Sequence, residues 1–199
     1  MIYQKQKTMK SAFNKLTKAE KRIAIAKDVL MAIKSDVYNP ETGNYVEPYF
    51  FSYFNRKDSV QTLLLQDRLK GCTVCALGAC FLSLVKFTNR LTIDELTPID
   101  ANTMFINDNT KIHSNGKATS RLRKIFSKTQ LTLIEVAFER SAYFADGVRI
   151  NKELIENAVY FWQNFTRYEE DSVSEELLTG IMENIIANNG EFIPRINSI

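Results

Sequence analysis

The chain has 199 residues, of which 45% are hydrophobic and 25% are charged, the composition of a globular protein with a sizeable core. Its 7 glycines and 4 prolines together make up about half the usual share of ~12% of residues. This argues against a β-sandwich or barrel, because those folds need frequent turns rich in glycine and proline. The most hydrophobic stretch, residues 72–85, is shorter than the ~20 residues that span a bilayer, so we expect no membrane partner.

The formal net charge of +3 conceals two end regions of opposite sign, with a weakly positive middle between them. Lysine and arginine are concentrated in residues 1–34, whereas aspartate and glutamate are concentrated in residues 151–199. A basic front of this kind is typical of a nucleic-acid-binding arm, and an acidic tail is typical of an interaction segment. The two ends can equally attract each other, either within one chain or between the copies of a homo-oligomer.

The predicted elements of the first half are helical with one exception. Residues 1–15 are predicted to be a flexible basic arm. A capping box from Thr17 to Glu20 then opens a helix that ends near Ser35, where turn residues follow. Residues 44–54 are aromatic and contain a proline, which predicts a short β-hairpin or an aromatic loop.

The second half continues the helical pattern. Ser127 to Gln130 forms a further capping box, and Asn188-Asn189-Gly190 has the composition of a left-handed C-cap. We therefore predict a mainly α fold, a single-domain bundle of about six helices over residues 1–199. The segments with helical signals after the aromatic segment, some too short to count as full helices of the bundle, cover residues 59–69, 72–87, 92–97, 119–126, 127–143, 151–165 and 172–187.

The clustered cysteines, Cys72, Cys75 and Cys80, are the first candidates for chemistry. Without a signal segment they are typical of a reduced, cytoplasmic protein. Together with His113, the single histidine, they offer an alternative zinc set, and Cys72 before a predicted helix offers an alternative nucleophile. Their spacing also places small side chains on one helix face, which favours core packing. We expect no catalytic residue, metal ion or cofactor.

A basic run follows the predicted loop over residues 100–117. A Walker A loop is excluded because Lys111 and Ala118 stand where that motif requires glycine and serine or threonine. Cationic side chains before and on a short helix nevertheless predict a site for a small anionic ligand or a nucleic-acid backbone. The candidate ligand-binding residues are His113, Lys117, Arg121, Arg123 and Lys124. The alternative is a solvated helix face.

The aromatic segment predicts a protein-binding patch if its side chains are exposed, since aromatic residues are enriched in interface hot spots. The candidate residues are Tyr49, Phe50, Phe51, Tyr53 and Phe54. Beside basic residues the same rings can stack on nucleic-acid bases, and if buried they cover the helical core.

Three segments, residues 72–81, 126–131 and 181–194, resemble small uncharacterised proteins of bacteriophages and other mobile elements. The resemblance implies an accessory or anti-defence role in the host cytoplasm and supplies no catalytic residue. Our leading hypothesis is a non-enzymatic accessory protein that binds a host protein or sequesters a ligand. The alternatives are a nucleic-acid-binding protein, which uses the basic N-terminus and residues 111–128, and a nucleotide-binding enzyme.

Overall fold

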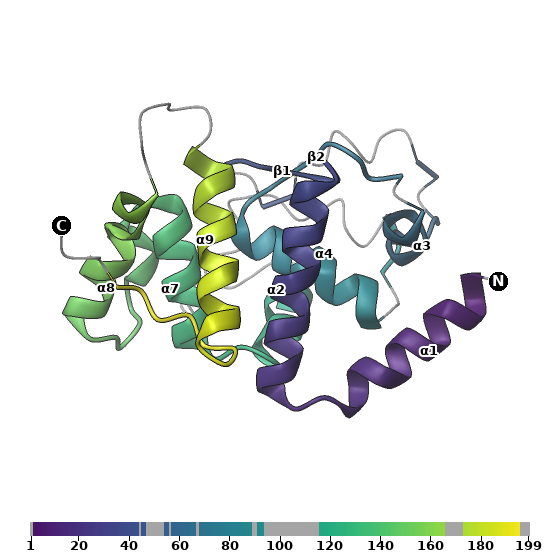
Figure 1. Cartoon of the computed structure of the whole chain (residues 1–199), viewed down its shortest axis with the longest axis horizontal. Helices are drawn as coiled ribbons and strands as arrows, with labels where there is room; N and C mark the ends of the chain where they lie inside the picture. Colours follow the sequence, from purple (N-terminus) through teal and green to yellow (C-terminus); the bar gives the residue numbers. More distant parts are fainter. Residues whose placement is uncertain are drawn as a thin grey trace.

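The computed structural model of the chain describes residues 2–43, 45–46, 54–55, 57–66, 68–88, 91–93, 116–165 and 173–195. Within these residues the fold is mainly α, as the sequence predicts, with one small parallel sheet (Figure 1). The helices are α1 (Ile2–Lys15), α2 (Lys18–Lys34), α3 (Val60–Leu65), α4 (Ala76–Thr88), α6 (Gly116–Arg123), α7 (Lys128–Glu139), α8 (Lys152–Val159) and α9 (Val173–Ala187). Two 3-10 helices, η3 (Ala142–Ala145) and η4 (Phe161–Asn164), flank α8.

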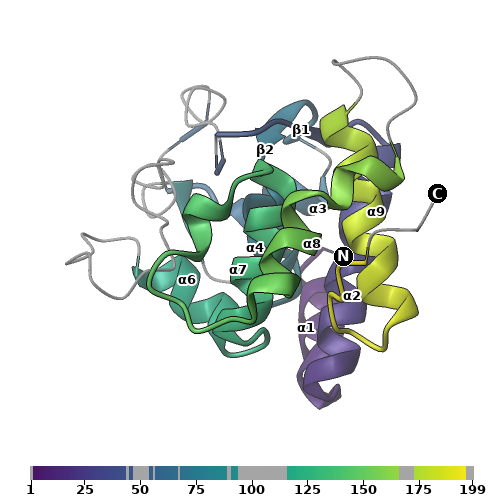
Figure 2. The ribbon, with the colours of Figure 1, turned by 90° about the vertical axis from the view of Figure 1, so that its left-hand side faces the viewer.

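Helix α4 is the central element of the core. Its residues from Ala76 to Val85 are all buried, and it packs against α1, α2, α3, α6 and α7. Helices α2 and α9 lie side by side and make the most extensive contact between described elements (Figure 1). Figure 2 shows α7 and α8 beside each other on the face that is turned away from α1. Nearly all of the buried apolar side chains of these helices belong to a single cluster.

The sheet lies elsewhere than the predicted hairpin near residues 44–54. Strand β1 (Tyr38–Pro40), predicted as a turn, pairs in parallel with strand β2 (Cys72–Val74). The prediction of one helix over residues 72–87 was therefore wrong at its start, because an apolar run by itself does not distinguish a buried strand from a buried helix. Val46 forms an isolated antiparallel bridge with Val74, and residues 47–53 lie outside the described part of the chain.

Capping residues set the helix boundaries much as the sequence predicts. The Thr17 hydroxyl accepts the Glu20 N–H, and the Glu20 carboxylate accepts the Thr17 N–H at 2.8 Å, which confirms the first capping box. Ser127 caps α7 through the Gln130 N–H at 3.1 Å. The helix over 127–143 is shorter than predicted, because Arg140 adopts a left-handed conformation and ends α7.

Helix α1 occupies the segment predicted as a flexible basic arm. Its Phe13 side chain is buried and stacks on Phe87 of α4, with ring centroids 4.7 Å apart and planes 2° apart. Helix α1 therefore packs against α4 through an aromatic contact, while Lys7 and Lys15 remain exposed. The opposite end of the chain also differs from the prediction, since the helix over 151–165 divides into α8 and η4 at Tyr160.

Candidate functional site

A pocket of about 330 Å³ lies between α1, α2, α4 and the end of α6. We call it the basic pocket, because three of its lining side chains are cationic and none of its described lining residues is acidic. Its volume lies within the range of small-molecule sites. The lining residues are Phe13, Asn14, Lys21, Leu84, Thr88, Arg121, Lys124 and Ile125.

One wall of the basic pocket is formed by the start of α2 and the end of α1. The Lys21 Nζ lies 5.9 Å from the centroid of the Phe13 ring, and it donates to the Asn14 carbonyl at 3.4 Å. Phe13 is fixed in turn by its stack on Phe87. The ammonium group of Lys21 is thus held beside an aromatic surface, a favourable position for a cation that also meets solvent.

Another part of the lining comes from the corner where α6 ends and α7 begins. The buried side chains of Leu122 and Phe126 anchor this corner in the core. The Phe126 N–H also donates to the Leu122 carbonyl at 2.8 Å, which closes the turn between them. Arg22 of α2 reaches across and donates to the Ile125 carbonyl at 3.0 Å. The main chain that carries Lys124 is therefore fixed on both sides, while the Lys124 side chain is exposed.

The structure brings together part of the predicted anion site. Arg121, which is half-buried, and Lys124 both line the basic pocket. Arg123 is exposed and is not among the lining residues. The main chain of Lys117 lies in α6, but its side chain lies outside the described part of the structure, as does all of His113. Lys21, which the sequence placed only in the basic front, joins the site.

The predicted cysteine set is buried in the core and packs there. Cys72 lies in β2 and not at a helix start, and it is Cys75 that precedes α4. Burial raises the pKa of the Cys75 thiol well above its ordinary value and that of Cys80 to about 12. Both thiols therefore stay protonated near neutral pH and are poor nucleophiles.

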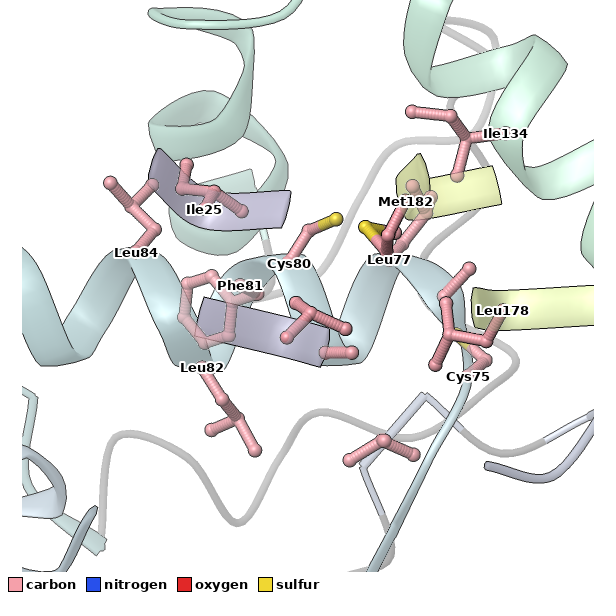
Figure 3. Close-up of a cluster of buried hydrophobic side chains, with 14 of the residues drawn as sticks. Ile25, Cys75, Leu77, Cys80, Phe81, Leu82, Leu84, Ile134, Leu178 and Met182 are labelled. Atoms are coloured by element: carbon pink, nitrogen blue, oxygen red, sulfur yellow. The ribbon is translucent and has the colours of Figure 1, made fainter. Parts of the chain in front are cut away.

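Apolar neighbours explain these raised values. Figure 3 shows Cys75 and Cys80 among side chains of α4, α7 and α9. No group of three or more metal-ligating side chains occurs within the described residues, which include all three cysteines. The labelled apolar neighbours in this view are Ile25, Leu77, Phe81, Leu82, Leu84, Ile134, Leu178 and Met182.

The predicted protein-binding segment is described only at its end. Tyr49, Phe50, Phe51 and Tyr53 lie outside the described residues, so the patch stays a prediction. Phe54 is half-buried, with the guanidinium of Arg68 5.3 Å from its ring centroid.

A partly buried ion pair beside the core was not predicted from the sequence. Asp28 of α2 accepts from the Lys86 Nζ of α4 at 2.7 Å, and its second oxygen has no hydrogen-bond partner among the described residues. Gln61 of α3 donates its amide to the Lys86 carbonyl at 2.7 Å. Lys86 also lines a second pocket of about 360 Å³. The other residues of that pocket are Met31, Ala32, Lys34, Ser35, Val37, Tyr38 and Leu64.

A second buried polar group lies on α7. Burial, followed by the negative charge of Glu139, raises the pKa of Glu135 well above its ordinary value. Burial also raises the pKa of Glu139, although its carboxylate accepts the Gly43 N–H at 3.0 Å. One Glu135 oxygen and the Tyr45 hydroxyl are buried without a hydrogen-bond partner in the described part of the chain. The spacing of polar residues along a helix does not show that such a side chain is buried, because burial depends on the elements that pack against the helix.

The chain matches no protein-family model, no curated protein and no solved structure. Among the described helices, none is both long enough and apolar enough to cross a membrane.

Proposed function

We propose that this chain is a non-enzymatic binding protein that holds a small anionic ligand in the basic pocket. One observation carries the proposal. Lys21 from the basic front and Arg121 and Lys124 from the basic run, about a hundred positions apart in the chain, line one pocket together with apolar side chains. Cations that converge on a concave surface are the usual means of recognising an anion.

The lining also indicates the shape of the ligand. Phe13, Leu84 and Ile125 contribute apolar surface to the lining of the same pocket. A ligand that carries a phosphate or carboxylate on a flat apolar body can pair its charge with the cations and bury its body against these side chains. Because the cations meet solvent, the charge contribution is expected to weaken as ionic strength rises.

Titration calorimetry with phenyl phosphate at ~50 mM salt tests the proposal. We expect saturable binding to the wild-type chain, and a loss of about tenfold in affinity for Lys21→Gln and for Lys124→Gln, since each removes one charge-assisted contact. Arg123→Gln is the matched control, because it removes an exposed cation outside the pocket lining and should leave the affinity unchanged. No binding, or equal affinity in all four chains, would contradict an anion site here.

Exposed lysines beside the pocket favour nucleic acid as a second candidate ligand. Lys7, Lys15 and Lys18 are exposed on α1 and α2, which continue from the wall that holds Lys21. A nucleic-acid backbone would contact these lysines as well as the pocket, and its affinity would then fall steeply with salt. Filter binding of a short and a long single-stranded oligonucleotide distinguishes the candidates. Tighter binding of the long strand, lost in Lys15→Gln/Lys18→Gln, favours nucleic acid over a small ligand.

The setting of this activity rests on the resemblance to phage and mobile-element proteins. We propose an accessory, anti-defence role in which the ligand is sequestered within the host. Binding of a host protein through residues 49–54 belongs to the same proposal, and a pull-down from bacterial lysate with Phe54→Ala as the control tests it. If the wild-type chain recovers no host protein in stoichiometric amount, the proposed binding of a host protein is wrong.

A further inference from the structure

The last described residues of the chain, 190–195, form a segment that runs back beside α9. We call it the C-terminal segment. Asn188, Asn189 and Gly190 make the turn, and both Asn189 and Gly190 have positive φ, of 53° and 87°. The Gly190 N–H closes the helix on the Ile185 carbonyl at 2.7 Å. After this turn the segment has no helix or strand of its own, and its main-chain groups need partners elsewhere.

Two side-chain amides supply those partners. Gln130 of α7 donates to the Phe192 carbonyl at 3.1 Å and accepts the Phe192 N–H at 2.5 Å. Asn184 of α9 donates to the Ile193 carbonyl at 2.9 Å and accepts the Ile193 N–H at 2.8 Å. Each amide therefore binds both main-chain groups of one residue, as a neighbouring β-strand would.

Side chains of the segment fit defined places. Phe192 is 1% exposed and meets Phe161 edge to face, with ring centroids 5.1 Å apart. Pro194 is buried. Arg22 donates to the Gly190 carbonyl at 2.6 Å and forms an ion pair with Glu191. We call this arrangement of Arg22, Gln130, Phe161 and Asn184 the cradle.

The cradle has the two components of a peptide-recognition site. The side-chain amides of Gln130 and Asn184 bind main-chain groups and so give affinity that does not depend on the sequence of the bound segment. The Phe192 contact and the Arg22 charge select an acidic residue followed by an aromatic one. This selection matches the segment itself, Gly190-Glu191-Phe192-Ile193-Pro194-Arg195.

We propose that the cradle is a peptide-recognition site whose resident ligand is the chain's own C-terminal segment, and that it accepts the same segment from a second copy. Every copy carries a segment that fits, and exchange preserves the contacts of Phe192 and Ile193 with the cradle, while the turn at 188–190 opens. The turn at 188–190 is the natural hinge, since opening it releases the left-handed conformation of Asn189. Exchange also places the basic front of one copy against the acidic tail of another through Arg22 and Glu191.

Mixing two full-length variants tests the exchange. Phe192→Ala keeps the cradle but weakens the segment, whereas Gln130→Ala keeps the segment but weakens the cradle. Each variant alone is expected to be monomeric by size-exclusion chromatography with light scattering, and the mixture is expected to form a one-to-one dimer. A mixture that stays monomeric overturns the proposal.

A synthetic peptide of residues 189–195 locates the contact. It should dissociate the mixed dimer and bind the Phe192→Ala chain. The peptide with alanine at 192 should have an affinity lower by at least about tenfold, because it lacks the buried ring. A dimer that the peptide does not affect lies at another surface and also overturns the proposal.

A second segment variant guards against a folding failure of Phe192→Ala. Glu191→Lys replaces a side chain that is 44% exposed, places a cation beside Arg22 and leaves the buried ring in place. It should form the same dimer with Gln130→Ala. Circular dichroism of each variant before mixing shows that the chain is folded.

Discussion

The two ends of α4 differ in their surroundings, since the start is enclosed by the protein and the end borders two pockets. At its start, residues 75–78 are buried, and Gly78 lies so close to the Tyr45 carbonyl that a Cβ would stand 1.6 Å from that oxygen. At its end, Leu84 and Thr88 border the basic pocket while Lys86 borders the second pocket. We call these the closed end and the open end. Residues usually associated with chemistry, two of the cysteines, lie at or near the closed end, and the ligand-accessible cations lie at the open end.

This comparison shows why residue type alone misleads. A thiol enclosed by apolar groups keeps its proton and contributes packing, whereas a lysine at a pocket wall keeps its charge in contact with solvent. Buried ionisable groups, near the closed end and in the Asp28–Lys86 pair, should therefore affect folding, whereas the cations that line the basic pocket should affect binding. Four substitutions test this difference.

Gly78→Ala should give the largest effect, because the new methyl group collides with main chain that cannot rotate away. We expect a loss of about 3 kcal/mol in the free energy of unfolding, the upper range for overpacking. Gly180→Ala is the matched control, since its Cβ would meet the Phe165 ring, a side chain that can move. Both alanines gain the same helix propensity. Equal denaturation midpoints for the two variants would contradict a rigid closed end.

Lys86→Met should follow, because it leaves the buried Asp28 carboxylate without its cation. We expect about 2 kcal/mol of destabilisation by urea unfolding, less than the loss of a fully buried pair, since 22% of the Lys86 side chain is exposed. The double variant Asp28→Asn/Lys86→Met removes the stranded charge and should recover much of the loss. A double variant less stable than Lys86→Met would show that the pair does not act as a unit.

Glu135→Gln probes a carboxyl whose pKa is raised in the folded chain. The unfolded chain loses this proton near the ordinary value of 4.5, whereas the folded chain keeps it to higher pH. Ionisation therefore favours unfolding, and wild-type stability should fall as pH rises from about 4.5 through the raised pKa.

The variant should lack most of this fall and be more stable than wild type near neutral pH by on the order of 1 kcal/mol. Unfolding midpoints between pH 4 and 8 measure it. Glu139 also has a raised pKa, whereas Cys75 and Tyr45 keep their protons over this pH range, so Glu139→Gln serves as the comparison and should remove a smaller part. Parallel pH curves for wild type and Glu135→Gln would refute the assignment.

Lys124→Gln should change stability least, within about 0.5 kcal/mol, because its side chain is exposed. Thermal unfolding checks this value, and the same variant should lose anion affinity. A large destabilisation would place Lys124 in the structural framework and not at a binding surface.

Local signals in the sequence predicted much of the fold. The Thr17–Glu20 capping box and the turn at 188–190 depend on residues within one or two turns of each other, and both are confirmed. Strand β2 was missed because its partner, Tyr38–Pro40, lies in a different region and carries turn-forming residues. Gln130 shows the same limit, since its side chain serves Phe192, 62 positions away, and not the capping box.

The charged residues of the candidate site were predictable from the sequence, but their arrangement around one pocket was not. Arg121 and Lys124 were identified from a basic run, and Lys21 from a basic front, yet nothing local shows that α1, α2 and α6 meet at one pocket. Asp28 and Lys86 were unremarked for the same reason, because 58 positions separate them and each resembles a surface charge on its own helix.

The packing of α2 against α9 has a consequence for synthesis. A chain leaves the ribosome from its N-terminus, so α2 is exposed while all of the residues up to α9 are still being added. Its buried face gains this cover only when α9 has been added, and Arg22 reaches Gly190 across 168 positions. The core of the described residues is therefore completed only after α9 has been synthesised, and a message truncated before α9 yields a product with apolar surface uncovered.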